Sequence, residues 1–160
     1  MINRRRPHVF VLPEDDANSQ LANGFLLNLD RLGLTRIQVL PEAGGWRVVL
    51  DQFQSEHVAA MDRYTERYMI LLIDFDRDEG RMDYAKGTIP EHLSDRVFIL
   101  GAWIDPEALR RDLGSYETIG NALAEDCRLE TDRTWGHRLL LHNASEITRL
   151  RQRIRPILFS

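Results

Sequence analysis

The sequence predicts an α/β protein of three layers, with a Rossmann-like, mainly parallel four-stranded sheet flanked by helices and a helical C-terminus. Short apolar runs alternate with longer segments of helical periodicity. Strands separated by helices need crossover connections, which make neighbouring strands parallel. With 160 residues, 43% of them hydrophobic, the chain is long enough to bury a core and short enough to favour one domain.

Four apolar runs are the predicted strands. They cover residues 8–12, 37–40, 68–73 and 97–100. The run at 68–73, Tyr-Met-Ile-Leu-Leu-Ile, is the most apolar and is the predicted central strand, because strands buried on both faces read as continuous apolar runs.

Helical periodicity fills the segments between these runs. We expect helices at 17–32, 46–67, part of 77–92, 108–113, 117–128 and 137–154, the last begun or restarted near Asn143. The predicted organisation is a single domain of residues 1–160, with a core over 8–113 and a helical C-terminal extension over 114–160.

Composition excludes several classes of protein. The single cysteine, Cys127, excludes an internal disulfide framework and a cysteine-rich zinc site. No apolar run approaches the roughly 20 residues of a membrane span. The apolar stretch after the basic N-terminus stops at Leu12, which is too short for a signal peptide. We therefore expect a cytoplasmic protein without a membrane partner. The net charge of −4 does not by itself predict binding to nucleic acid.

Acidic residues follow three of the four predicted strands, with Glu42 after the second. Glu14, Asp15 and Asp16 come after the first, and Asp74 and Asp76 after the third. Ligands of parallel sheets bind beyond the carboxyl ends of the strands, and residues two apart in extended chain point to the same side. Neighbouring carboxylates repel unless a cation lies between them, and Mg²⁺ prefers carboxylate oxygen. The pattern predicts a site for one or two Mg²⁺ (or Mn²⁺) ions, which activate water or a 3′-hydroxyl and stabilise charge on a phosphodiester. The alternative is that Asp15 and Asp16 only cap a helix.

The order of these motifs resembles the Toprim domain of topoisomerases, bacterial primases and OLD-type nucleases. The matching stretches are Val-Phe-Val-Leu-Pro-Glu at 9–14, Ala-Gly-Gly at 43–45 and Ile-Leu-Leu-Ile-Asp-Phe-Asp-Arg-Asp-Glu-Gly-Arg at 70–81. The resemblance implies that Asp74 and Asp76 hold Mg²⁺ and that Glu14 is the general acid or base. Supporting positions are Asp15, Asp16, Gly44, Gly45, Arg77 and Asp78.

The sequence also departs from the Toprim pattern. Asp15 stands where the family usually has Gly, Asn18 where it often has an acid, and Gly101-Ala102 where small stand-alone relatives have an acid. A second resemblance, of residues 11–21 to the opening of a receiver domain, makes Asp74 a phosphorylated aspartate, although the usual later Lys is missing. The predicted function is a small nuclease, or a defence or repair subunit, that acts on or binds nucleic acid. The alternative is a non-catalytic Toprim-like or receiver-like interaction module.

Arginine supplies 20 of the 21 basic residues and gathers near the chain ends. The C-terminal group is Arg149, Arg151, Arg153 and Arg155. One interpretation is a helix whose arginines contact nucleic-acid phosphates. The other is a homodimer or partner-protein contact, with the arginines paired to acids on this chain or another.

Overall fold

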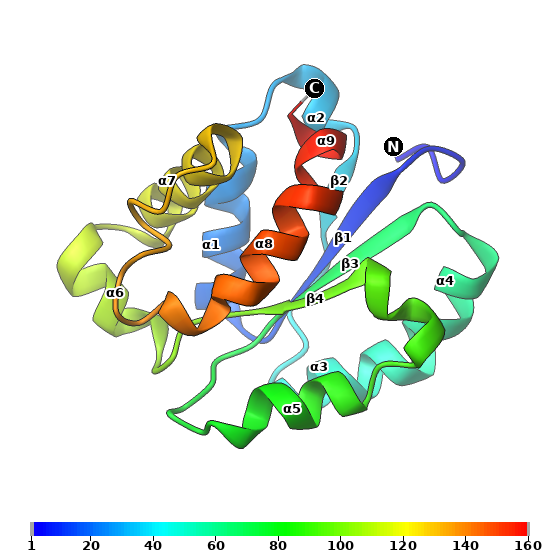
Figure 1. Cartoon of the computed structure of the whole chain (residues 1–160), viewed down its shortest axis with the longest axis horizontal. Helices are drawn as coiled ribbons and strands as arrows, with labels where there is room; N and C mark the ends of the chain where they lie inside the picture. The colour runs from blue at the N-terminus through cyan, green and yellow to red at the C-terminus, as the bar shows by residue number, and fades with distance from the viewer. Residues whose placement is uncertain (1, 160) are drawn as a thin grey trace.

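The computed structural model describes residues 2–159 and confirms a three-layer α/β fold around an all-parallel sheet (Figure 1). The strands are β1 (His8–Pro13), β2 (Ile37–Val39), β3 (Arg67–Leu72) and β4 (Val97–Leu100). Their order across the sheet is β2-β1-β3-β4. The register pairs Pro13 of β1 with Leu72 of β3, so the carboxyl ends of these two central strands lie at one level.

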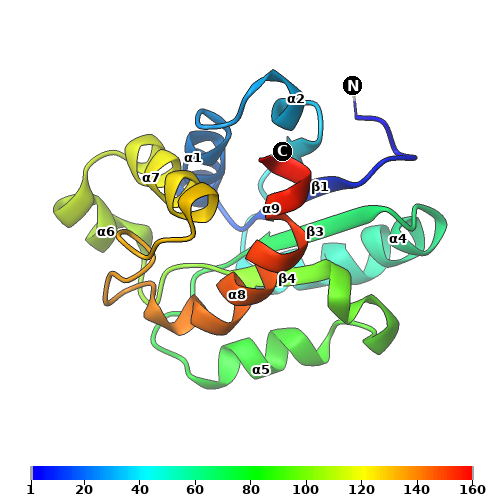
Figure 2. The ribbon, with the colours of Figure 1, turned by 45° about the horizontal axis from the view of Figure 1, so that its top comes forward.

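Helices cover both faces of the sheet (Figures 1 and 2). One face carries α1 (Asp16–Leu26), α7 (Tyr116–Leu129), α8 (Ala144–Arg153) and α9 (Arg155–Leu158). The other carries α3 (Trp46–Gln52), α4 (Val58–Arg63) and α5 (Gly80–Gly87). The remaining helical segments are α2 (Arg31–Leu34), a π-helical turn (Phe53–His57), 3₁₀ turns (Glu91–Arg96 and Leu141–Asn143) and α6 (Pro106–Leu113). None of the helices within residues 2–159 is long and apolar enough to cross a lipid bilayer.

Side-chain alternation along β1 divides the core into two clusters. Val9 and Val11 face the layer that contains α1 and α7, whereas Phe10 and Leu12 face the layer that contains α3 and α5. Residues beyond 113 are part of the first cluster, because Ile119 packs with Val9 and Val11 in one buried group. The C-terminal helices therefore form one layer of the fold.

Three predicted helices differ in their boundaries from the observed ones. The segment predicted as one helix over 17–32 is two, because Asp30 caps α2 by accepting a hydrogen bond from the Gly33 N–H (2.7 Å). The helical segment that starts at Trp46 contains the π-helical turn and ends at Arg63, and Arg67 already pairs with β1. The last long helix starts at Ala144, close to the predicted restart.

The open edge of β4 is covered by side chains from the C-terminal region. Glu146 is fully buried and accepts a hydrogen bond from the Ile99 N–H (3.0 Å). Asn143 accepts from the Gly101 N–H (3.2 Å) and donates to the Gly101 carbonyl (2.9 Å). Backbone groups that would otherwise offer an edge to another strand are satisfied within the chain.

Two glycines allow α1 and α7 to cross in backbone contact. A Cβ at Gly120 would lie 2.0 Å from the carbonyl oxygen of Leu21, and one at Gly24 would lie 2.3 Å from that of Glu117. We expect Gly120→Ala to lower the free energy of unfolding by about 3 kcal/mol, because the helices must separate to admit the methyl group. Urea denaturation measures the change. Gly87→Ala is the control, since nothing lies within 4 Å of its added Cβ. Equal stabilities of the two variants would contradict the close crossing.

Candidate functional site

The carboxyl ends of β1 and β3 bring Glu14 and Asp74 together. Beyond the Pro13–Leu72 pair, the Glu14 N–H donates to the Leu72 carbonyl (2.9 Å). The Glu14 side chain in turn accepts a hydrogen bond from the Asp74 N–H at Oε2 (2.6 Å). Two residues 60 positions apart are thus held side by side by the sheet register.

Asn18 links Asp74 to Asp15. It lies fully buried in the first turn of α1, and its Nδ2 donates to Asp15 Oδ1 (3.0 Å) and to Asp74 Oδ1 (3.1 Å). Asp15 is also the N-cap of α1, since its Oδ1 accepts from the Asn18 N–H (3.0 Å). Asp15 therefore caps the helix and also belongs to the site. We call Glu14, Asp15 and Asp74 the acidic cluster.

The acidic cluster is electrostatically strained. Burial raises the pKa of Asp74 to about 7, and repulsion from Glu14 and Asp15 adds to the effect, against the hydrogen bond from Asn18. Burial likewise raises the pKa of Glu14, and the nearby charge of Asp15 contributes. Within residues 2–159, no basic side chain forms an ion pair with any of the three carboxylates. Asp74 therefore exchanges its proton near neutral pH.

Asp76 begins a turn two residues after Asp74, and its place beside Asp74 in the site stays a prediction. β3 ends at Leu72, and the backbone at Asp76 (φ 48°) and Arg77 (φ 58°) is left-handed. The Ile73 and Phe75 N–H groups still donate to the Leu100 (2.9 Å) and Ala102 (3.0 Å) carbonyls, so the chain stays paired beside β4 up to the turn at Asp76. Asp76, Arg77 and Asp78 are exposed, and Asp78 accepts a hydrogen bond from the Gly80 N–H (2.9 Å) ahead of α5.

The Gly44-Gly45 turn lies directly against the acidic cluster. The Gly44 N–H donates to the Glu14 carbonyl (2.8 Å), and Gly44 has a φ of 100°, a conformation that side chains disfavour. Gly45 then serves as the N-cap residue of α3. The turn places Trp46 beside Glu14. Asp16 lies outside the cluster, exposed, and accepts from Gln20 (2.6 Å).

Arginine and aromatic side chains border the acidic cluster on its α3 and α5 side. Arg81 donates from Nη1 to the backbone oxygen of Asp74 (2.7 Å), and its guanidinium lies 4.2 Å from the Trp46 ring centroid. Trp46 packs edge-on against Tyr84, which is 56% exposed. Sequence analysis did not assign Asn18, Arg81 or Trp46 to the site. The signal for Arg81 was its place seven residues after Asp74 in a helical segment, but that spacing alone does not specify a contact.

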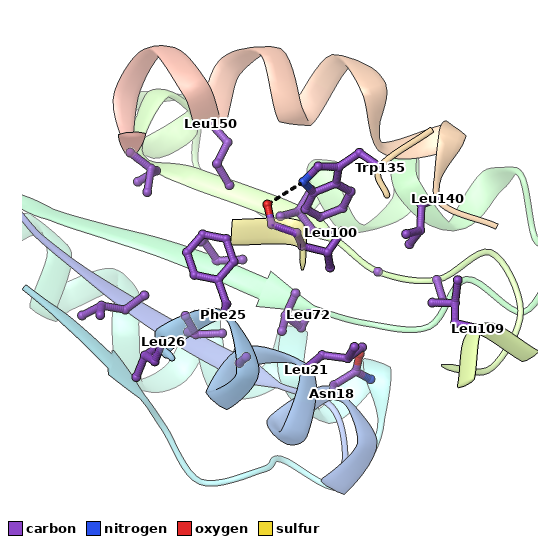
Figure 3. A pocket seen from close by; sticks show the side chains of 18 residues that line it. Asn18, Leu21, Phe25, Leu26, Leu72, Leu100, Leu109, Trp135, Leu140 and Leu150 are labelled. Carbon is purple, nitrogen blue, oxygen red and sulfur yellow. Dashed lines mark hydrogen bonds between the residues drawn. The ribbon is translucent and has the colours of Figure 1, made fainter. Parts of the chain in front are cut away.

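An apolar cavity lies behind the acidic cluster, between the sheet and α1, α7 and α8 (Figure 3). It has a volume of about 70 Å³, and Asn18 is the polar side chain at its end nearest Asp74. Asn18 Oδ1 is buried and has no hydrogen-bond partner among the described residues. The acidic cluster thus lies next to apolar side chains. This explains why burial has the largest effect on the pKa of Asp74.

The acidic cluster can bind Mg²⁺ only if water supplies most of the ligands of the ion. Carboxylate oxygens are the ligands this ion prefers, and it commonly takes one or two of them with water. Glu14 and Asp74 supply two. Among residues 2–159, however, no group of three or more His, Cys, Asp or Glu side chains is arranged to hold a metal ion.

The C-terminal arginines mostly bind within the chain. Three of the four tie α8 and α9 to neighbouring segments. Arg149 contacts Glu146 and the carbonyls of Ser94 and Val97, Arg151 contacts Asp132 and the Thr131 carbonyl, and Arg155 contacts the carbonyls of Cys127 and Arg128. Arg153 is exposed and makes no side-chain bond to the described part of the chain. Pairing to acids on this chain is thus observed for Arg149 and Arg151.

The chain was compared with protein-family models, with curated proteins and with solved structures, and none of them matches it.

Proposed function

We propose that the acidic cluster binds Mg²⁺ or Mn²⁺ and that the protein binds or cleaves nucleic-acid phosphodiesters in the cytoplasm, as a small nuclease or as a defence or repair subunit. One observation carries the proposal. Asp74 is partly buried beside Glu14 and Asp15, and no basic side chain pairs with it. A divalent cation at this point relieves the repulsion between the carboxylates.

The residues of the acidic cluster divide the proposed chemistry between them. Asp74 and Glu14 are the ligands, and a bound Mg²⁺ stabilises the negative charge that develops on a phosphodiester. The alternative role for Glu14, as the general acid or base, excludes it as a ligand, because a carboxylate bound to the metal stays ionised. Asn18 orients Asp74, and Arg81 holds the backbone at Asp74.

A second candidate function is a non-catalytic module that binds a partner protein or a second copy of the chain. It is favoured by the lack of a three-ligand metal group among residues 2–159. The buried amide of Asn18 favours it too, since it already occupies the space between Asp15 and Asp74.

Titration with Mg²⁺ and Mn²⁺, followed by thermal unfolding and calorimetry, tests metal binding. We expect the metal to stabilise the natural protein by about 2.7 kcal/mol at a concentration one hundred times the dissociation constant. Asp74→Asn removes this stabilisation. Asp51→Asn, at an exposed position in α3, is the matched control and keeps it.

A cleavage assay on plasmid and single-stranded DNA distinguishes the two candidate functions. Metal-dependent cleavage that disappears in both Asp74→Asn and Glu14→Gln supports a nuclease. Metal binding without cleavage supports a protein that binds nucleic acid without cutting it, and the absence of both metal binding and cleavage supports the non-catalytic module. Absence of any Asp74-dependent metal effect contradicts the proposed metal site.

A further inference from the structure

Three arginines surround Tyr64 at the end of the sheet opposite the acidic cluster. The N-terminal segment and the turn from α4 to β3 lie together there (Figures 1 and 2). The guanidinium carbons of Arg4, Arg63 and Arg67 lie 5.1, 5.3 and 4.8 Å from the Tyr64 ring centroid. Arg4 also donates a hydrogen bond from Nη1 to Tyr64 Oη (3.1 Å). We call Arg4, Arg63, Arg67 and Tyr64 the arginine cluster.

Arg67 is the buried member of the arginine cluster. It is 3% exposed, and its guanidinium lies 4.2 Å from the Phe10 ring centroid as well as against Tyr64. Its Nε donates to His8 Nε2 (3.0 Å). His8 contacts the Arg6 carbonyl through Nδ1 (2.8 Å), so the ring donates there and accepts from Arg67 as a neutral imidazole. Arg67 Nη2 is buried and has no partner among the described residues.

The arginine cluster forms no ion pair with an acid in the part of the chain that the structure describes. Within residues 2–159, no carboxylate lies within ion-pair distance of Arg4, Arg63 or Arg67. Glu66, the neighbour of Arg67, is exposed and pairs with none of them. Burial and the charge of Arg4 both lower the pKa of Arg67. A buried cation without a counter-ion destabilises the fold unless an anion binds nearby.

Some arginines elsewhere in the protein do have a counter-ion. Arg128, Arg149 and Arg151 each form an ion pair with an acid of the chain. A fourth arginine near the cluster, Arg96, donates to the carbonyls of Tyr64 (3.2 Å) and Arg67 (3.0 Å) and so adds positive charge. The arginine cluster and Arg96 thus bring four arginines together at this end of the sheet.

We propose that the arginine cluster binds a phosphate-type oxyanion, carried by inorganic phosphate, a phosphomonoester or the phosphodiester of a nucleic-acid strand. Guanidinium groups match phosphate oxygens in charge and in hydrogen-bond geometry, and the Tyr64 hydroxyl offers a further donor. The six-residue strands β1 and β3 separate this site from the acidic cluster by roughly 20 Å. The two proposed sites are thus independent, and an experiment can contradict one proposal without contradicting the other.

Phosphate titration at constant ionic strength tests the site. We expect inorganic phosphate to raise the unfolding temperature and to give a binding isotherm. Arg4→Gln and Arg63→Gln are exposed substitutions that leave the buried Arg67 in place, and each is expected to weaken binding roughly tenfold. Arg153→Gln, an exposed arginine elsewhere, is the matched control and keeps the affinity of the natural protein. Asp74→Asn also keeps it, which separates this result from the metal site.

A second arm identifies the source of the phosphate. A ten-residue thymidine oligonucleotide that competes with inorganic phosphate supports a nucleic-acid strand as the ligand. Phosphate binding without such competition supports a free phosphate or phosphomonoester. The proposal is overturned if phosphate has no more effect than chloride at equal ionic strength, or if Arg4→Gln and Arg63→Gln both bind phosphate as tightly as the natural protein does.

Discussion

Replacing Asn18 by Asp is expected to lower the free energy of unfolding at pH 8 by about 3–5 kcal/mol in the absence of divalent metal. The substitution puts a further carboxylate between Asp15 and Asp74 at a fully buried position and removes the two hydrogen bonds that the amide donates. Magnesium is expected to restore most of the lost stability, because the new carboxylate adds a fourth ligand group to those of Glu14, Asp15 and Asp74. Urea denaturation with and without Mg²⁺ measures both effects.

The matched control for Asn18→Asp is Asn28→Asp. Asn28 also donates to a carboxylate, Glu125 Oε2 (3.1 Å), but its other hydrogen bond is to Asn121, so it belongs to a different contact. We expect Asn28→Asp to destabilise the protein without rescue by Mg²⁺. Equal Mg²⁺ rescue of the two variants, or rescue of neither, would count against a cation site at Asp74.

The free energy of unfolding of the natural protein is expected to fall as the pH rises from 4 to 8 because Asp74 ionises. In Asp74→Asn this part of the decrease is expected to be absent. With a pKa of about 7 in the folded protein, against 3.8 in the unfolded chain, Asp74 takes up a proton on folding between these two pH values. Its contribution to stability is therefore complete below pH 4 and is lost as the pH rises through 7. The two pKa values correspond to at most about 4 kcal/mol.

Chemical denaturation of both proteins from pH 4 to pH 8 gives this contribution as a difference. We expect Asp74→Asn to be the more stable protein at pH 8, where the natural carboxylate is ionised beside Glu14. Asp51→Asn should follow the natural pH curve, because Asp51 is exposed. A constant difference between natural protein and Asp74→Asn across the range would show that Asp74 is ionised throughout.

The two proposed sites place opposite charges at the two ends of the same strands. Residues that enter β1 and β3 lie beside Arg4, Arg63 and Arg67, and residues that leave them are Glu14, Asp15 and Asp74. A net charge of −4 averages over this separation. The distribution of charge is therefore more informative about anionic ligands than the total.

Much of the fold follows from local patterns. The four apolar runs became the four parallel strands, because a run of apolar residues bounded by polar ones has few other ways to bury itself. Helix ends were less predictable. The break between α1 and α2 depends on the Asp30 cap, and the π-helical turn in the segment from Trp46 to Arg63 leaves no mark in the periodicity of the sequence.

The sequence by itself determined which residue types end the strands: Glu14 after the first, Asp74 after the third, and Gly44-Gly45 after the second. Only the tertiary structure decided which of them meet. Register between β1 and β3 joins Glu14 to Asp74, and a left-handed turn begins at the second aspartate, Asp76. The roles proposed for Asn18 and for the arginines around Tyr64 depend on long-range contacts. Asn18 binds Asp74 across 56 positions of chain, and Arg4 binds Tyr64 across 60. Spacing in sequence cannot reveal such contacts, because they depend on how strands and helices pack rather than on local backbone preference.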